Sequence, residues 1–180
     1  MIIGAYGLFW EEELVDWKAR PWRLLGRQGL NSGSLRIVDF RRARGVYILY
    51  NDINVYYVGL AVGNNGIGSR IRDHLNDEHS QLWNRFSWFT FDSPDHEGVI
   101  GDDGVETVAQ TYSGVENLDT KDLIRDLEAL LQQAMQPLAN KAMTNFADGE
   151  EWYQVANRTP DVLLFEDLAP RLRRDPQEKE

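Results

Sequence analysis

The sequence predicts an α+β protein with a small central sheet of three strands flanked by helices. Two short runs rich in β-branched and aromatic residues, 45–50 and 55–60, are typical of strands. Turn-forming residues between them, in 51–54, indicate that the two runs form a hairpin. Apolar residues at helical spacing follow in 67–75 and again in 119–136, so each of these segments is predicted to be a helix.

Residues 1–44 are predicted to pack on this core, because they run directly into the first strand of the hairpin. Within them, 1–10 alternates loosely and predicts an edge strand, and 35–40 predicts another strand. A helix is expected over 10–20, since three glutamates in its first turn interact favourably with the helix dipole and Pro21 would end it. The length of 180 residues fits one domain with extensions at both ends.

The third strand and the second helix are expected to supply the rest of the core. An aromatic stripe over 86–91 predicts a strand that buries Phe86, Phe91 and either Trp88 or Phe89. On the helix over 119–136, the predicted core face comprises Leu123, Leu127, Leu130, Leu131 and Ala134. Beyond it, 152–165 predicts a further strand or a packing arm.

The segment 92–118 interrupts this pattern. It contains seven acidic residues and no lysine or arginine, together with four glycines and Pro94. Because it has neither a helical nor a strand period, it is predicted to be a long loop or a mobile insertion. It holds most of the negative excess of a chain whose formal net charge is −10, so the remaining surface can still be basic in places.

Four side chains suited to binding a phosphate are expected to lie near one another. Tyr47 and Tyr57 come from the two paired strands, and Arg70 and His74 are four residues apart, on one side of a helix. The glycine-containing loop before that helix is expected to be a flexible connection, because its spacing fits neither the Rossmann fingerprint nor the P-loop. Tyr56 is expected to point away from this group, since neighbouring strand residues face opposite sides.

The order of these residues resembles the GIY-YIG nuclease superfamily over roughly 45–145. The tripeptides GVY and YVG occupy the two strands, and an arginine with a histidine four residues later follows on the helix. Glu128 on the second predicted helix and Asn140 after a proline match the remaining landmarks of that family. The resemblance implies a GIY-YIG-like core, with the extensions 1–44 and 146–180 outside it and 92–118 as an insertion.

The resemblance also implies a role for each of these residues in cutting DNA. Tyr47 is expected to activate the attacking water, and Arg70 to hold the non-bridging phosphate oxygens. Tyr57 and His74 would orient the water or the phosphate, and His74 could share in proton transfer. Asn140 would support the site by hydrogen bonding.

The implied activity is that of a metal-dependent DNA endonuclease. With Glu128 as the one dedicated acid, a single Mg²⁺ (or Mn²⁺) that keeps several waters is the expected cofactor. The alternative is a non-catalytic nucleic-acid-binding or protein-interaction module on the same fold. Sequence specificity would come from the extensions, from a homodimer or from an accessory protein, because no separate DNA-reading domain is visible in the sequence.

A group of arginines lies beside the predicted site and is interpreted either as a solvated charged surface or as a set of DNA phosphate contacts. Its members are Arg36, Arg41, Arg42, Arg44 and Arg72. One hypothesis is that the acidic insertion covers this basic face and competes with DNA until it is displaced. A solvated surface loop explains the insertion at least as well.

The composition excludes disulfides and thiolate metal sites, because the chain has no cysteine. No apolar run of membrane length and no signal peptide are recognised, so a cytoplasmic protein is expected. A metal cluster among the charged residues of 73–80 is conceivable, but ordinary charges at a helix end are the favoured interpretation.

Overall fold

The computed structural model of the chain describes residues 3–29, 35–92, 94, 100–108, 120–136, 145–146 and 149–156. Its strands are β1 (Ala5–Glu11), β2 (Leu25–Gln28), β3 (Arg36–Asp39), β4 (Gly45–Asn51), β5 (Asn54–Ala61), β6 (Arg85–Thr90), β7 (Glu106–Thr107), β8 (Glu150–Glu151) and β9 (Tyr153–Gln154). Its helices are α1 (Gly66–Asp73), α2 (Thr120–Met135) and the short 3-10 helix η1 (Glu12–Leu14). The α+β class is therefore confirmed.

The first sheet contains five strands, in the order β5-β4-β6-β1-β8, and not the three that were expected. The predicted strands form its centre: β4 pairs with β5 as the expected hairpin and with β6 along its other edge, both antiparallel. β1 pairs with β6, and β8 pairs in parallel with β1. The alternation in residues 1–10 correctly predicted a strand, but β8 covers its free edge, so that strand is interior.

A second sheet has the strand order β7-β3-β2-β9. β2 and β3 are antiparallel neighbours, β9 joins β2, and β7 joins β3 in parallel. The segment 92–118, expected to be a loop, thus contributes β7. This strand has only two residues, which is too short to show an alternating pattern in the sequence.

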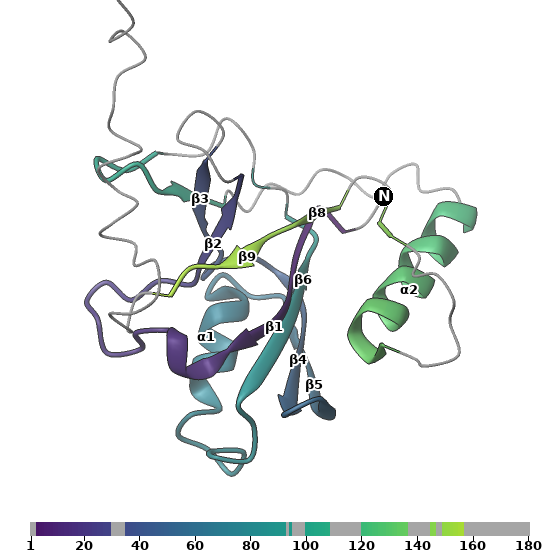
Figure 1. Ribbon diagram of the computed structural model, residues 1–180, viewed down its shortest axis with the longest axis horizontal. Coiled ribbons are helices and arrows are strands. Elements are labelled where there is room, and N and C mark those ends of the chain that lie inside the picture. Colours follow the sequence, from purple (N-terminus) through teal and green to yellow (C-terminus); the bar gives the residue numbers. More distant parts are fainter. Residues whose placement is uncertain are drawn as a thin grey trace, which may run out of the picture.

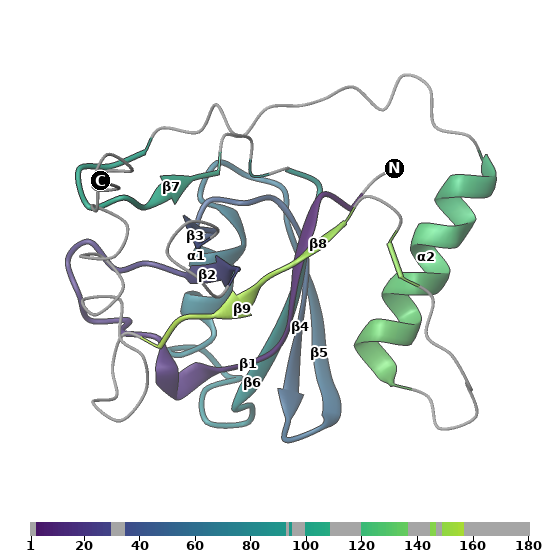
Figure 2. The same ribbon diagram turned by 45° about the horizontal axis from the view of Figure 1, so that its top comes forward.

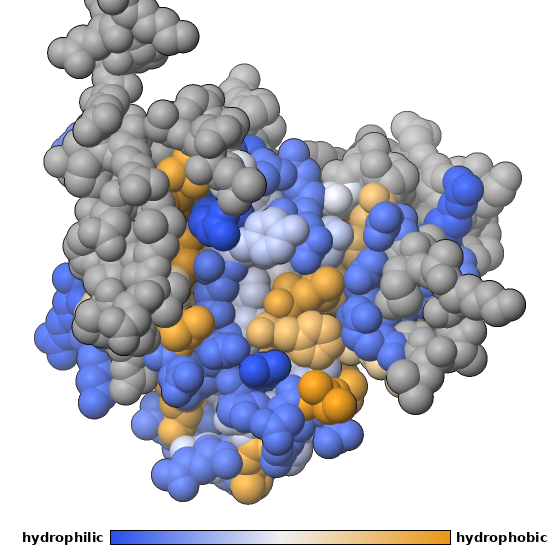
Figure 3. Space-filling model, in the orientation of Figure 1, coloured by the Kyte–Doolittle hydropathy of each residue, from blue (hydrophilic) through white to orange (hydrophobic). Residues whose placement is uncertain are grey.

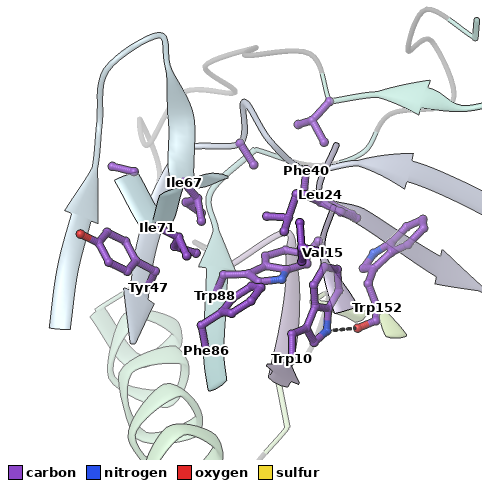
Figure 4. Close-up of a cluster of buried hydrophobic side chains, with 14 of the residues drawn as sticks. Trp10, Val15, Leu24, Phe40, Tyr47, Ile67, Ile71, Phe86, Trp88 and Trp152 are labelled. Atoms are coloured by element: carbon purple, nitrogen blue, oxygen red, sulfur yellow. Dashed lines mark hydrogen bonds between the residues drawn. The ribbon is translucent and has the colours of Figure 1, made fainter. Parts of the chain in front are cut away.

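Aromatic side chains fill the space between the two sheets (Figure 4). The ring centroid of Phe40 lies 4.3 Å from that of Trp88 and 5.0 Å from that of Trp152. Nε1 of Trp10 donates to the carbonyl oxygen of Trp152 at 3.2 Å. Because Trp10 is buried here as part of β1, the helix expected over 10–20 does not form, and only η1 follows the strand.

The two α-helices cover opposite faces of the first sheet, as Figures 1 and 2 show. Side chains alternate along β4, so Tyr47 packs with α1, whereas Ile48 and Tyr50 pack with α2. The hydroxyl of Tyr50 donates to the carbonyl oxygen of Ala134 at 3.0 Å. Within the described part of the chain, neither helix combines the length and the apolar character needed to cross a membrane.

Several apolar side chains that were expected in the core are exposed. Phe91 follows the end of β6 and is 45% exposed, whereas Trp88 and Phe89 are both buried. On α2, Leu127 and Leu131 are more than half exposed, because the helix turns its small residues to the sheet.

Further exposed apolar side chains lie on the edge strand β5 and its flanks: Ile53, Val55, Val58, Leu60 and Val62. Figure 3 shows apolar surface of this kind around the β4–β5 hairpin and beside α2.

The start of β4 gives a direct test of the pairing between β4 and β6. A Cβ atom at Gly45 would collide with the backbone carbonyl oxygen of Phe89, which cannot move without breaking that pairing. Gly45→Ala is therefore expected to lower the free energy of unfolding by about 3 kcal/mol, measured by urea denaturation. Gly63→Ala is the matched control, since a Cβ atom there meets nothing within 4 Å. Equal stability of the two variants would contradict the pairing.

Candidate active site

Tyr47 is held by the core and turns its polar atom away from it. Its ring is fully buried and packs beside Ile67 and Ile71 of α1. Figure 4 shows the ring at one end of the aromatic cluster, with its hydroxyl directed away from the other aromatic rings. Packing thus fixes the ring and leaves the hydroxyl free to interact with the residues that follow α1.

The helix α1 is anchored at its first residues. Gly66 has a φ of +71°, and a Cβ atom there would collide with the backbone of Arg42. The N–H of Ile67 donates to the carbonyl oxygen of Ala43 at 2.7 Å. The glycines therefore let the helix start lie directly against the chain that leads into β4. The loop before α1 was expected to be a flexible connection, but this contact fixes the start of the helix. The last turn of α1 consequently lies next to the hydroxyl of Tyr47.

Tyr47, His74 and Asp77 form a chain of hydrogen bonds. The hydroxyl oxygen of Tyr47 lies 2.8 Å from Nε2 of His74, and Nδ1 of the same ring lies 2.6 Å from Oδ2 of Asp77. The backbone N–H of His79 donates to the other carboxylate oxygen at 2.8 Å, which fixes the carboxylate. The carboxylate favours a proton on Nδ1, which leaves Nε2 to accept the proton of the Tyr47 hydroxyl.

Asp77 belongs to the segment 73–80, whose charged residues were expected to be ordinary charges at a helix end. The chain turns directly after α1, and the N–H of Ser80 donates to the carbonyl oxygen of Asp77 at 3.1 Å. The sequence signal that could have revealed the contact is an acid three residues after His74. That signal is weak, because the turn that closes the contact has no distinctive residues.

Tyr57 and Arg70 border the same group. The ring centroid of Tyr57 lies 6.2 Å from that of Tyr47 and 4.9 Å from that of His74. Arg70 interacts electrostatically with Tyr47, and its side chain is 51% exposed, with Nη1 3.8 Å from the carboxylate of Asp73. The structure thus brings together the four residues that were expected to bind a phosphate, with the guanidinium on the solvent side.

Tyr56 reaches this region as well, although its side chain was expected to face the other side of the sheet. Its hydroxyl oxygen lies 3.0 Å from Nδ1 of His79, and the His79 ring also contacts Tyr57 at 4.9 Å between centroids. The cause is a β-bulge: the partners of Val55 and Tyr57 on β4 are consecutive, so Tyr56 is an extra residue. A bulge interrupts the alternation from which the opposite orientation was inferred.

Glu128 is not brought to this group. It lies on α2, which packs on the face of the first sheet opposite to Tyr47. Its side chain is exposed, and Oε1 accepts a hydrogen bond from Nε2 of Gln132 at 3.0 Å. A divalent ion on Glu128 therefore does not fit the site around Tyr47, because the sheet lies between them. Asn140 lies outside the described residues.

Two of the five arginines expected to contact DNA are held in largely buried ion pairs. Arg36 Nη2 lies 2.6 Å from Oε2 of Glu106, and Arg44 Nη2 lies 2.5 Å from Oδ1 of Asp92. Both acids belong to 92–118, so this segment does lie against arginines, as the hypothesis of a covering insertion requires. Competition between the insertion and DNA stays a hypothesis.

Two of the other three arginines are partly buried against Trp22. The guanidinium carbons of Arg41 and Arg72 lie 5.5 Å and 5.1 Å from the ring centroid of Trp22. Arg41 also pairs with the buried carboxylate of Asp39 at 3.7 Å. Arg42 is exposed. DNA contact by these three side chains stays a prediction.

The environment sets distinct protonation states along the chain of hydrogen bonds. Burial raises the pKa of Tyr47 to about 12, with Tyr57 adding to the rise and Arg70 opposing it. Desolvation acts to raise the pKa of Asp77, but hydrogen bonds from His79 and His74 outweigh it and lower that pKa. At neutral pH the Tyr47 phenol is therefore neutral, and Asp77 is a carboxylate.

Comparisons with known proteins assign no family to this chain. No family model matches it, and no curated protein and no solved structure is significantly similar to it. The resemblance to GIY-YIG nucleases consequently depends on the motif residues themselves and stays a prediction.

Because the pKa of Tyr47 is raised, the free energy of unfolding is expected to change with pH in the alkaline range. Between about pH 10 and pH 12 the folded chain keeps a phenol proton that the unfolded chain has lost, so stability falls as pH rises. Tyr47→Phe is expected to make this fall shallower by up to about 1.4 kcal/mol per pH unit, measured by urea denaturation across that range. The exposed Tyr153→Phe serves as control. The same slope in wild type and Tyr47→Phe would contradict the raised pKa.

Proposed function

We propose that this chain is an endonuclease that hydrolyses phosphodiester bonds in DNA at the group formed by Tyr47, Tyr57, Arg70 and His74. The observation that carries the proposal is the contact between the Tyr47 hydroxyl and Nε2 of His74 at 2.8 Å, beside a half-exposed guanidinium. The resemblance to GIY-YIG nucleases supports DNA as the substrate. A buried phenol joined to an imidazole and a carboxylate is a proton-transfer arrangement, and the guanidinium supplies an anion site next to it.

Water activation is assigned to Tyr47 and His74 acting together. The phenol cannot ionise alone near neutral pH, because its pKa is raised to about 12. As the Tyr47 proton passes to Nε2 of His74, the phenol oxygen takes a proton from the attacking water. The water oxygen bonds to phosphorus while the bond from phosphorus to the leaving strand's oxygen breaks, and that oxygen takes up a proton from solvent. Asp77 stabilises the imidazolium that forms and keeps Nε2 in the accepting state beforehand.

Stabilisation of the negative charge on the phosphate is assigned to Arg70. Its guanidinium can hold two non-bridging oxygens through parallel hydrogen bonds, and this interaction strengthens as negative charge builds up in the transition state. Half of the side chain is exposed, so a DNA backbone can reach it. Tyr57 lies beside both Tyr47 and the His74 ring, where its hydroxyl can orient the water.

A bound divalent ion would stabilise the leaving oxygen, as the resemblance implies. The position of Glu128 behind the sheet gives that ion no place next to Arg70 and His74. No step of the proposed reaction is therefore routed through an ion on Glu128.

Arg70→Ala tests the anion site. Loss of one transition-state donor is expected to slow the nicking of supercoiled plasmid by about 100-fold to 1000-fold. Arg27→Ala is the matched control, because this arginine lies on β2 in the second sheet and is expected to leave nicking at the wild-type rate. Nicking by Arg70→Ala at the rate of the control would contradict the proposed site.

Glu128→Ala tests the separation of α2 from the site. Because Glu128 lies on the other face of the sheet, the variant is expected to nick plasmid at the wild-type rate in Mg²⁺ buffer. The family resemblance implies the opposite result, loss of cleavage. A Glu128→Ala variant that is inactive while its circular dichroism spectrum is unchanged would contradict the placement of α2 and favour Glu128 as the metal ligand.

A further inference from the structure

Two histidines and an aspartate gather directly after α1, at the edge of the proposed active site. One potential ligand atom from each of His74, Asp77 and His79 lies within 4.8 Å of the other two. We infer that these three side chains bind a divalent transition-metal ion of the zinc type. The inference concerns metal binding alone and does not depend on the proposed cleavage of DNA.

The ligand types select the ion. Two imidazole nitrogens and one carboxylate oxygen suit Zn²⁺ and related transition metals, whereas Mg²⁺ prefers oxygen ligands alone. Bonds of about 2.1 Å to a shared ion require only small rotations of side chains that already lie this close. Oε1 of the exposed Glu78 lies 3.8 Å from Nε2 of His79, so a fourth ligand atom is within reach.

Each histidine is already oriented by a tyrosine on its other nitrogen. Nε2 of His74 contacts the Tyr47 hydroxyl at 2.8 Å, and Nδ1 of His79 contacts the Tyr56 hydroxyl at 3.0 Å. A metal-binding histidine commonly has its second nitrogen held in this way, which fixes the direction of the ring. The nitrogens left for the ion are Nδ1 of His74 and Nε2 of His79, and the first of these points at Asp77.

The carboxylate is oriented too. Oδ1 of Asp77 accepts the backbone N–H of His79 at 2.8 Å, while Oδ2 lies 2.6 Å from Nδ1 of His74. An ion bound between Nδ1 and Oδ2 replaces their hydrogen bond. The side chains of Asp77 and His79 are 38% and 22% exposed, so an ion can enter from solvent.

Metal binding and the proton relay use the same atom of His74 and exclude one another. With an ion on Nδ1, the ring proton of a neutral imidazole resides on Nε2, which then donates to the Tyr47 oxygen and no longer accepts from it. An ion at this site therefore blocks proton transfer from Tyr47 to His74. For this reason the inference is tested by binding and not by cleavage, so that the two proposals can fail separately.

The experiment titrates Co²⁺ into the metal-free, tag-free full chain and follows its visible absorption, with Zn²⁺ added afterwards as a competitor. One Co²⁺ per chain is expected, displaced by Zn²⁺. His79→Gln and Asp77→Asn each remove one ligand at an exposed or half-exposed position. Each is expected to weaken binding more than the roughly 100-fold that loss of an outer contact can cost.

Two further variants make the result specific. His96→Gln removes the remaining histidine of the chain and is the matched control, with binding expected at the wild-type affinity. Tyr56→Phe removes the hydroxyl that orients His79 and is expected to weaken binding by about 10-fold to 100-fold. Absence of a visible Co²⁺ band in wild type, or equal affinity of His79→Gln and His96→Gln, would overturn the inference.

Discussion

Strand β4 is hydrogen-bonded along both edges and buried on both faces, and the arrangement of the rest of the molecule follows from this position. Its partners β5 and β6 bring the tyrosines of the hairpin and the aromatic stripe of the third strand to either side of it. Because side chains alternate, Tyr47 on one face of β4 packs in the cluster with α1, and Ile48 and Tyr50 on the other face pack against α2. The same alternation that builds the core separates Glu128 from the proposed site.

Two of the arginines that were expected to contact DNA are instead paired with acids within the fold. Arg36 and Arg44 neutralise acids of the segment 92–118, so arginines that precede the hairpin in sequence hold a distant part of the chain in place. Buried pairs of this kind are costly to break, since either partner alone would remain an uncompensated charge. Any nucleic acid would consequently be met by exposed cations such as Arg70, whose side chain is 51% exposed.

The parts of the fold that the sequence predicted well are those encoded locally. The hairpin, the third strand and both helices each have a period or turn that lies within one short segment. The strand predicted over 35–40 forms β3, but its assembly into a second sheet was missed. The other strands of that sheet are short, and β9 pairs with a distant part of the chain, with Arg27 beside Tyr153. In the site, Tyr47, Tyr57, Arg70 and His74 were found from motif order. Asp77 and Tyr56 were missed because a turn and a bulge, which leave no clear pattern, bring them there.

The bulge in β5 has a consequence for how this chain can change in evolution. Residues Val55 and Tyr57 oppose consecutive residues of β4, so a deletion of Tyr56 alone would restore a regular ladder without shifting the strand on either side. Such a shortened chain would keep Tyr57 beside Tyr47 and lose only the hydroxyl that orients His79. The tyrosine pair and the orientation of His79 can therefore change independently. A homologue that lacks only this one residue would keep the tyrosine pair and lose the oriented histidine.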